Sequence, residues 1–186
     1  MEDAAIVALY WTRDEEAIAQ TRTKYGPYCH SIAQNILGSR EDAQECVNDT
    51  YLGAWNAMPP QRPALLPAFL GKITRNLSLK RWRERTAEKR GGGQVPLALE
   101  ELAFAIPSGD SPQAAVEAKE LAQTIDRFLR GLPKTERQIF LRRYWYLESI
   151  EAIAAAFGFG QSKVKMMLLR TRKKLKGLLE KEGIVL

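Results

Sequence analysis

The stretch from Ala152 to Lys176, AIAAAFGFGQSKVKMMLLRTRKKLK, is uncharged in its first half and strongly basic in its second. Apolar residues around its start recur at the i, i+3, i+4, i+7 spacing of an amphipathic helix, and a serine precedes them where a side chain caps a helix N-terminus. These residues are Ser149, Ile150, Ile153, Ala154 and Phe157. The GFG that follows predicts a turn, so the stretch has the order helix, turn, helix that is typical of DNA-binding helix-turn-helix units.

The basic second helix is expected to have one core-facing stripe. On a helical wheel this stripe consists of Val164, Met167, Leu168, Thr171, Leu175, Leu178 and Leu179. Lysines and arginines line both flanks, and two apolar side chains, Met166 and Leu169, point away from the core. The cations suit phosphates, and base contacts are expected from Gln161, Ser162, Lys165 and Met166. From this stretch alone, an ordinary helical hairpin with a solvated basic face remains open.

The composition of the whole chain favours an acidic partner. Its 186 residues carry a formal charge of +6 and the pI is about 9.4, which favours nucleic acid over a membrane surface. No segment resembles a signal peptide or approaches the roughly 20 apolar residues that cross a bilayer, so we expect a cytoplasmic protein without a membrane partner. Cys29, Cys46 and His30 are too few for a structural zinc site. We therefore expect no metal, no cofactor and no catalytic residue.

Helical patterns recur along the chain, whereas strand patterns with a period of two are nearly absent. We expect an all-α protein with two small helical domains, residues 1–86 and 113–186, joined by a linker over residues 87–112. A kink or break is expected at Gly26-Pro27. The linker contains VPLALEELAFAIP, which is too apolar for a purely flexible tether and is expected to form a short helix or to lie against another part of the protein.

A second basic segment runs from Phe69 to Arg90, with eight cations against two anions. Basic residues interleaved with aromatic ones suit a nucleic-acid strand whose bases are unstacked. The apolar residues Phe69, Ile73 and Leu77 are expected in the core.

Acidic residues line one side of the helix predicted from Arg40 to Met58, on which Ala43, Val47, Tyr51, Ala54 and Met58 form the inward face. These polar residues are Asp42, Glu45 and Asp49, with Asn48 beside them. No histidine or metal motif is near them, so a solvated face, or a docking face for a basic protein, explains them better than acid-base catalysis.

Three segments, in this order, together resemble the extracytoplasmic-function (ECF) sigma factors, which are bacterial RNA polymerase initiation subunits. REDAQECVNDTY resembles their polymerase-docking helix, FLGKITRNLSLKRWR their promoter-melting segment, and LPKTERQIFLRRYW with SIEAIAAAFGFGQSKVKMMLLRTRKKL their C-terminal helix-turn-helix. The resemblance implies a non-enzymatic protein that binds core RNA polymerase and promoter DNA and directs promoter-specific transcription initiation. Any anti-sigma factor would be a separate chain.

The resemblance also implies a role for each segment. Docking on the largest polymerase subunit would use Asp42, Glu45, Asn48 and Asp49. The melted −10 element would be captured by Gln61, Arg62, Lys72, Arg75, Asn76, Lys80 and Arg81. The −35 element would be contacted by Arg143, Gln161, Ser162, Lys163, Lys165, Met166, Leu169, Arg170 and Lys173. The linker would thread toward the RNA exit path.

Five positions depart from the residues usual in that family. They are Asn48, Phe69, Ala152, Lys163 and Met167, where the family usually has Gln, Trp, Glu, Thr and Arg. Two other classes explain less of the chain. A stand-alone helix-turn-helix regulator would bind duplex DNA without polymerase, usually as a symmetric dimer. A helical enzyme would need a nucleotide loop, zinc signature or nucleophile elbow, and the sequence contains none of these motifs.

Overall fold

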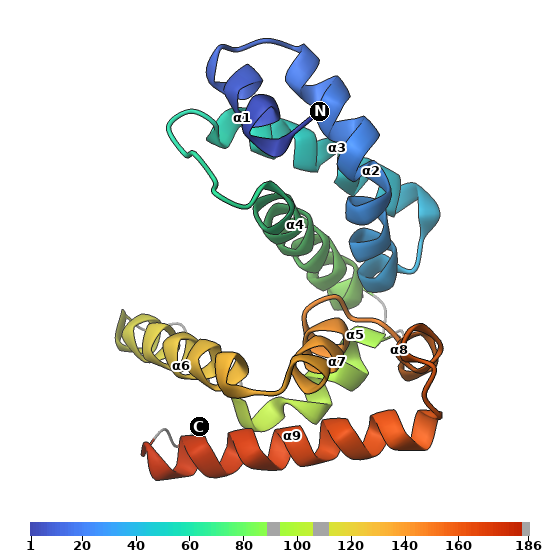
Figure 1. Ribbon diagram of the computed structural model, residues 1–186, viewed down its shortest axis with the longest axis vertical. Helices are drawn as coiled ribbons and strands as arrows, with labels where there is room; N and C mark the ends of the chain where they lie inside the picture. The colour runs from blue at the N-terminus through green and yellow to red at the C-terminus, as the bar shows by residue number, and fades with distance from the viewer. Residues whose placement is uncertain (89–93, 106–111, 184–186) are drawn as a thin grey trace. The chain divides into compact units, whose positions relative to one another are not determined.

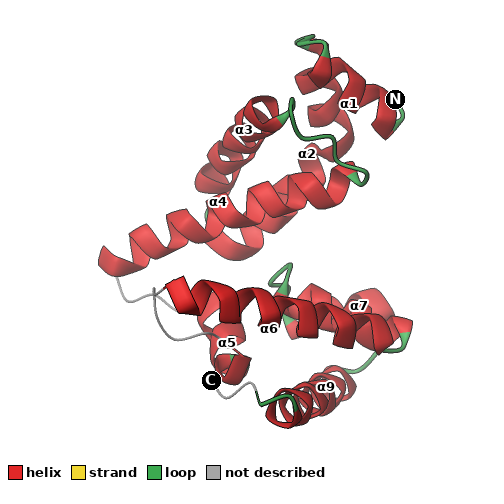
Figure 2. Cartoon of the chain, turned by 90° about the vertical axis from the view of Figure 1, so that its left-hand side faces the viewer, coloured by secondary structure: helices red, strands yellow, loops and turns green. Residues whose placement is uncertain are grey.

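The computed structural model describes residues 1–88, 94–105 and 112–183, and within these ranges helices are the only regular secondary structure (Figure 2). The all-α prediction is therefore confirmed. The chain divides into two compact units, Met1–Gly93 and Gln94–Leu186, which we call unit 1 and unit 2. Unit 1 contains α1 (Asp3–Trp11), α2 (Glu16–Leu37), α3 (Arg40–Ala57) and α4 (Leu66–Glu88) (Figure 1). Unit 2 contains α5 (Gln94–Glu101), a 3-10 turn (Ala103–Ala105), α6 (Pro112–Gly131), α7 (Lys134–Tyr144), α8 (Ile150–Phe157) and α9 (Gln161–Lys181).

In unit 1, α2, α3 and α4 pack on one another and α1 packs on α2. Helix α3 begins where Ser39 accepts a hydrogen bond from the backbone N–H of Asp42 at 3.3 Å, which is an ordinary N-cap. Its predicted inward residues Ala43, Val47, Tyr51, Ala54 and Met58 are all buried, as the wheel predicted. Helix α2 continues through Pro27, so the chain does not break there. The proline lies on the surface side of the helix, and the backbone hydrogen bond that its ring removes is lost near solvent.

Small residues form the buried seam between α3 and α4. Cys46 and Thr50 of α3 face Thr74 and Ser78 of α4, with 3.1 Å between the two threonine hydroxyls and 3.1 Å between the Cys46 sulfur and the Ser78 hydroxyl. Each threonine hydroxyl also bonds to a carbonyl of its own helix, so the polar groups are satisfied without water. The seam lets the two helix backbones approach closely.

The prediction that Phe69, Ile73 and Leu77 are core residues is wrong in register, because all three are only half-buried. The buried positions of α4 are Leu66, Leu70, Gly71, Thr74 and Ser78. Apolar residues mark the core face only where the neighbouring helix leaves room for large side chains. Here the close approach selects small side chains instead, and the larger apolar residues lie on the flanks.

In unit 2, α8 and α9 have the predicted helix-turn-helix order. Ser149 caps α8 by accepting from the N–H of Ala152 at 3.1 Å, and Gly158 ends it in the left-handed conformation at φ 64°. Helix α9 buries Val164, Leu168, Thr171, Leu175 and Leu179, while Met167 and Leu178 of the predicted stripe are half-buried.

The apolar segment inside the predicted linker forms helix α5, which buries Val95 and Ala98 against unit 2. The boundary between the two units along the chain falls between residues 93 and 94. The described part of the segment 87–112 therefore lies mostly in unit 2. The domain limits at residues 86 and 113 stay predictions about function.

Gly71→Ala is expected to destabilise unit 1 by about 1–3 kcal/mol through overpacking. A Cβ at this position would lie 2.5 Å from the Tyr28 hydroxyl and 3.2 Å from its ring carbon Cζ. Gly177→Ala is the control, since its Cβ would meet nothing within 4 Å and alanine favours a helix by about 1 kcal/mol over glycine. Denaturant unfolding of the full chain measures both changes. Equal stabilisation by the two alanines would show that the α4 packing is not tight.

Candidate nucleic-acid and polymerase interfaces

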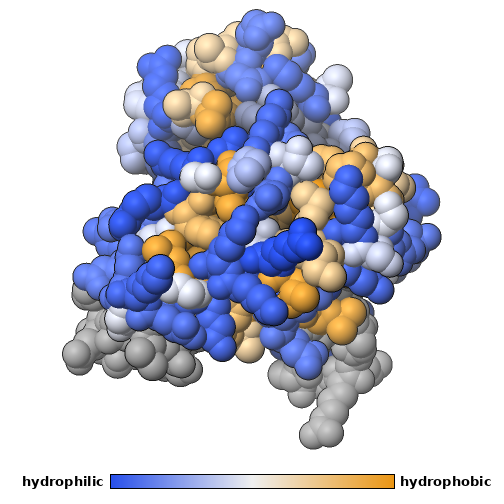
Figure 3. All heavy atoms as spheres, turned by 60° about the horizontal axis from the view of Figure 1, so that its bottom comes forward, coloured by the Kyte–Doolittle hydropathy of each residue, from blue (hydrophilic) through white to orange (hydrophobic). Residues whose placement is uncertain are grey.

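The N-terminal half of α9 presents the residues that were predicted to read duplex DNA. All eight of those on this helix are exposed, and they are Gln161, Ser162, Lys163, Lys165, Met166, Leu169, Arg170 and Lys173. Met166 is 46 % exposed and Leu169 is 38 % exposed, so two apolar side chains lie among cations on a solvent-facing surface. Figure 3, which brings the bottom of Figure 1 with α9 forward, shows hydrophobic patches between long hydrophilic side chains. This mixture suits phosphate contacts combined with apolar contacts to thymine methyl groups.

Aromatic residues hold the turn that precedes α9. The rings of Phe157 and Phe159 lie 5.9 Å apart between centroids, and the Lys163 ammonium lies 3.5 Å from the Phe159 centroid. The guanidinium of Arg142 lies 5.7 Å from the ring of Phe157. These contacts fix the start of α9 against α7 and α8, so Lys163 is placed by the turn as well as by its own helix.

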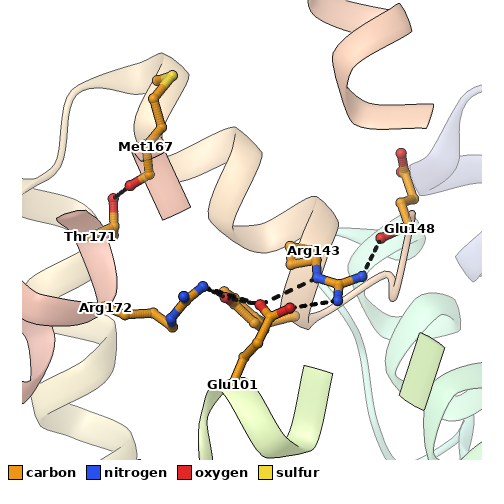
Figure 4. A network of polar contacts seen from close by, with 7 residues as sticks. Glu101, Arg143, Glu148, Met167, Thr171 and Arg172 are labelled. Atoms are coloured by element: carbon orange, nitrogen blue, oxygen red, sulfur yellow. Dashed lines mark hydrogen bonds and ion pairs between the residues drawn. The ribbon is translucent and has the colours of Figure 1, made fainter. Parts of the chain in front are cut away.

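Arg143 lies in a different environment from the rest of the predicted −35 set. It is 2 % exposed, and its Nη2 pairs with the Glu101 carboxylate at 2.8 Å while Nη1 donates to the Glu148 carbonyl at 3.1 Å (Figure 4). The guanidinium is committed to protein groups, so the geometry gives no support to the prediction that it lies near a phosphate.

Glu101, on α5, accepts hydrogen bonds from residues of both α7 and α9. Its Oε2 accepts from the Tyr144 hydroxyl at 2.6 Å. The same oxygen accepts from Nη1 of Arg172 at 3.1 Å (Figure 4). Burial alone would raise the pKa of the Glu101 carboxyl, but hydrogen bonds from Arg143 and Tyr144 and the two arginine charges outweigh it and hold that pKa below its ordinary value of 4.5. Burial and the Glu101 charge raise the pKa of Tyr144. The sequence prediction omitted Glu101, because nothing in the sequence indicates that a linker carboxylate meets α7 and α9.

In unit 1, the residues predicted for the −10 element separate into two groups. Lys72, Asn76 and Lys80 are spaced at i, i+4, i+8 and therefore share one outward face of α4. Arg75 is half-buried, and burial together with the charge of Arg83 lowers the pKa of its guanidinium. Arg81 is turned toward α3 instead.

Arg81, one of the predicted DNA-binding residues, forms ion pairs with two of the predicted docking residues. It lies 2.5 Å from the Glu45 carboxylate and 3.8 Å from Asp42, and Arg85 forms a further ion pair with Asp42. The carboxylates of Asp42 and Glu45 therefore already form ion pairs with arginines of unit 1. Asn48 and Asp49 are exposed, and within residues 1–88, 94–105 and 112–183 Asp49 has no ion pair.

The sequence prediction did not include Leu52, which lies on the predicted docking helix. It lies three residues after Asp49 and four after Asn48, so the three share one face of α3, and Leu52 is 58 % exposed. Asn48, Leu52 and Trp55 line a cavity of about 670 Å³ between α2 and α3, with Arg22 on the opposite wall. The same helical wheel that identified the acids could have found Leu52.

The loop that carries Gln61 and Arg62 is tied to α1. The indole N–H of Trp11 donates to the Gln61 carbonyl at 3.2 Å, and the Arg62 guanidinium lies 5.4 Å from the Trp11 ring. Arg13, just after α1, donates to the carbonyl of Trp55 in the last turn of α3 at 2.7 Å. Both predicted side chains are exposed, so this short helix positions a loop that faces solvent.

The described residues also bear on membrane crossing and on metal binding. No described helix combines the length and the apolar character that a bilayer crossing needs. In the part of the chain that the structure describes, no group of three or more His, Cys, Asp or Glu side chains could hold a metal ion.

Comparisons with known proteins match both units to one family. Residues 22–88 match the model described as Sigma-70 region 2, and residues 122–175 match the model described as Sigma-70, region 4. No curated protein sequence is significantly similar to the chain. A solved structure described as CnrH in complex with the cytosolic domain of CnrY is 21 % identical with a TM-score of 0.43, and the match covers 96 % of this chain and 97 % of that one.

Acid is expected to destabilise unit 2 partly through Glu101. Because its folded pKa lies below 4.5, the ionised carboxylate contributes stability that is complete above that ordinary value and is lost as the pH falls through the folded pKa. Denaturant unfolding between about pH 7 and pH 3 should therefore show the wild-type curve falling toward that of Glu101→Gln. A gap between the two proteins that stays constant over this range would contradict the role of the ionised carboxylate.

Proposed function

Because this chain belongs to the sigma-70 family, whose members bind core RNA polymerase and promoter DNA to direct transcription initiation, we propose that it is an ECF-type sigma factor and assign a role to each of its exposed faces. The docking face consists of Asn48, Asp49 and Leu52 on α3, with Glu45 at its edge. Lys72, Asn76 and Lys80 on α4, with the loop around Gln61 and Arg62, capture the melted −10 strand. The N-terminal half of α9 reads the −35 element.

The observation that carries this proposal is the separation of two outward faces in unit 1. The α3 face has a carboxylate, an amide and an exposed leucine beside an open cavity, which is a mixture typical of a protein interface. The α4 face has two lysines and an asparagine at helical spacing, which suits a nucleic-acid strand. A stand-alone DNA-binding regulator would not need the α3 face, and the region 2 match also disfavours that alternative.

Three further expectations stay predictions. They are the absence of enzymatic activity, the cytoplasmic location and an anti-sigma factor on a separate chain. Sigma factor families are generally not enzymes, which agrees with the first of them.

Docking is tested by affinity of the full chain for core polymerase. Asp49→Lys and Leu52→Ala should each weaken binding by about 1–2 kcal/mol, about 5- to 30-fold, if they lie in the centre of the interface. The double change Asp42→Lys, Glu45→Lys should also weaken it, but it breaks the ion pairs to Arg81 and Arg85 as well. Glu120→Lys is the control, because it makes the same charge reversal at an exposed residue of α6, outside the proposed face on α3. Wild-type affinity for both Asp49→Lys and Leu52→Ala would refute the docking face, and absence of any binding by the wild-type chain would refute the function.

Base reading and phosphate contact are expected to separate on α9. With the holoenzyme and a library of promoter variants, Met166→Ala should change preference at particular upstream base pairs by about 1 kcal/mol. Lys173→Ala should weaken binding to all variants alike, with a shallower salt dependence. Lys173 serves better here than Lys174, whose ammonium lies 3.3 Å from the Glu136 carboxylate. A uniform loss for Met166→Ala would remove it from the set of base-reading residues.

A further inference from the structure

We propose that a hollow between α2 and α3 binds the phosphate group of a phosphorylated small molecule about as large as a mononucleotide. The hollow has a volume of about 370 Å³, and we call it the anion pocket. Its polar or close-packed walls are formed by Arg22, Gly26, His30, Arg40, Gln44 and Tyr51. The inference goes beyond the proposed polymerase and promoter contacts, because none of the residues assigned to those contacts lines this pocket.

Two lines of residues, one on each helix, face each other across the anion pocket. On α2 the spacing i, i+4, i+8 places Arg22, Gly26 and His30 on one side of the helix. On α3, Arg40 and Tyr51 lie three turns apart on the side that faces α2. A Cβ on Gly26 would lie 3.2 Å from the Tyr51 hydroxyl. This hydroxyl therefore lies beside the backbone of α2, between the two longer side chains of the α2 line.

The polar side chains of the anion pocket are hydrogen-bond donors, and no acidic side chain lines it. Arg22 and Arg40 are both exposed, and within residues 1–88, 94–105 and 112–183 neither of them has an ion pair. His30 is half-buried and adds an imidazole N–H. The amide of Gln44 donates to Oδ1 of Asn48 at 3.4 Å and has a second N–H to offer. Two permanent positive charges thus share a hollow that an anion can enter.

Tyr51 adds a buried donor to the anion pocket. Its side chain is 4 % exposed, and its hydroxyl makes no hydrogen bond within the part of the chain that the structure describes. Burial raises the pKa of Tyr51 to about 12, so the hydroxyl keeps its proton at neutral pH and remains a donor. Buried polar groups in native proteins are nearly always hydrogen-bonded, and an oxygen of a ligand in this pocket would satisfy the hydroxyl. The Arg22 guanidinium lies 5.8 Å from the centroid of the same ring, which holds it close to this donor.

A phosphorylated molecule of nucleotide size fits these donors and this volume. A phosphate monoester presents three terminal oxygens with up to two negative charges, and guanidinium groups bind such oxygens in pairs. A volume of about 370 Å³ exceeds what one phosphate needs and lies in the range of about 300–1,000 Å³ of small-molecule sites. Pro27 and the buried Val47 provide apolar surface for the rest of the ligand.

An acidic side chain of the polymerase has the same charge, and Arg22 and Tyr51 also line the cavity of about 670 Å³ beside the proposed docking face. The buried Tyr51 hydroxyl favours the small molecule. It lies next to Gly26, which lines the anion pocket and not the larger cavity. Only a group that enters the hollow reaches this hydroxyl together with both guanidinium groups, and a phosphate has an oxygen for each of the three donors.

The first test uses His30 as a reporter in proton NMR of the full chain, because it is the only histidine of the sequence. ATP and pyrophosphate, added without magnesium at about 100 mM salt, should each shift the ring signals of His30 in a saturable way. Adenosine at the same concentration should leave them unchanged. No saturable shift with ATP, or an equal shift with adenosine, would overturn the proposal.

The second test measures ATP affinity of variants through the same signals. Arg22→Gln and Arg40→Gln should each weaken binding at least about fivefold, because each removes a charged donor. Tyr51→Phe should weaken it about 2- to 10-fold without loss of stability, since it deletes a hydroxyl that has no partner in the described chain. Arg137→Gln is the matched control, because it removes the same charge from α7, without an ion pair in the described chain. Equal ATP affinity for all four variants would refute the anion pocket.

The same signals separate the small molecule from the two macromolecules that the chain is proposed to bind. A short single-stranded DNA without a terminal phosphate should not shift the His30 signals, and a shift with this DNA but not with ATP would overturn the proposal. Weaker core-polymerase binding by Arg40→Gln, together with no ATP binding by the wild type, would assign the hollow to protein docking and also overturn it. The ATP titrations contain no polymerase, so failure of the chain to bind polymerase counts against the proposed function alone.

Discussion

The close approach of α3 and α4 is the constraint on which unit 1 depends. Small side chains at the seam, with Cys46 and Thr50 facing Thr74 and Ser78, bring the two backbones near each other while satisfying every hydroxyl. Because the helices are this close, a long side chain on α4 reaches the acids of α3, and Arg81 meets Glu45. The proposed docking face and the proposed −10 face are thus neighbours on one closely packed pair of helices, and the ion pairs between them lie at their common edge.

Unit 2 depends on a buried charged group and its partner, whereas unit 1 depends on small residues packed between two helices. A buried arginine would be costly without a partner, and the carboxylate that satisfies Arg143 comes from α5. In this chain a carboxylate is supplied to Arg143 from a segment 42 residues earlier. The stability of the DNA-reading unit is thereby linked to the segment that connects it to unit 1.

The sequence predicted the helices well where large apolar residues follow a 3.6-residue period. The core stripe of α9 and the inward face of α3 were predicted from this spacing. The N-cap of α8 was predicted from the serine that precedes its apolar residues. The sequence prediction of the buried face failed for α4. Small polar residues at helical spacing look the same in the sequence whether they lie in a core or face solvent. The sequence also could not predict the Glu101 contacts or the burial of Arg143, since both depend on which helices pack together. Exposed positions were predicted correctly on α9, whereas Leu52 was overlooked although its spacing from Asn48 and Asp49 places it on the same face of α3.

The contacts of α1 with the loop around Gln61 have a consequence for the exchange of modules between sigma factors. Trp11, which contacts this loop, and Arg13, which contacts the end of α3 just before it, both precede the residues 22–88 that the region 2 model matches. A chimera cut at the start of that match would carry the loop but leave its support behind. Under the proposed −10 role of this loop, a transplanted module therefore has to begin at α1, because changes in this helix would alter the position of the loop without contacting a base.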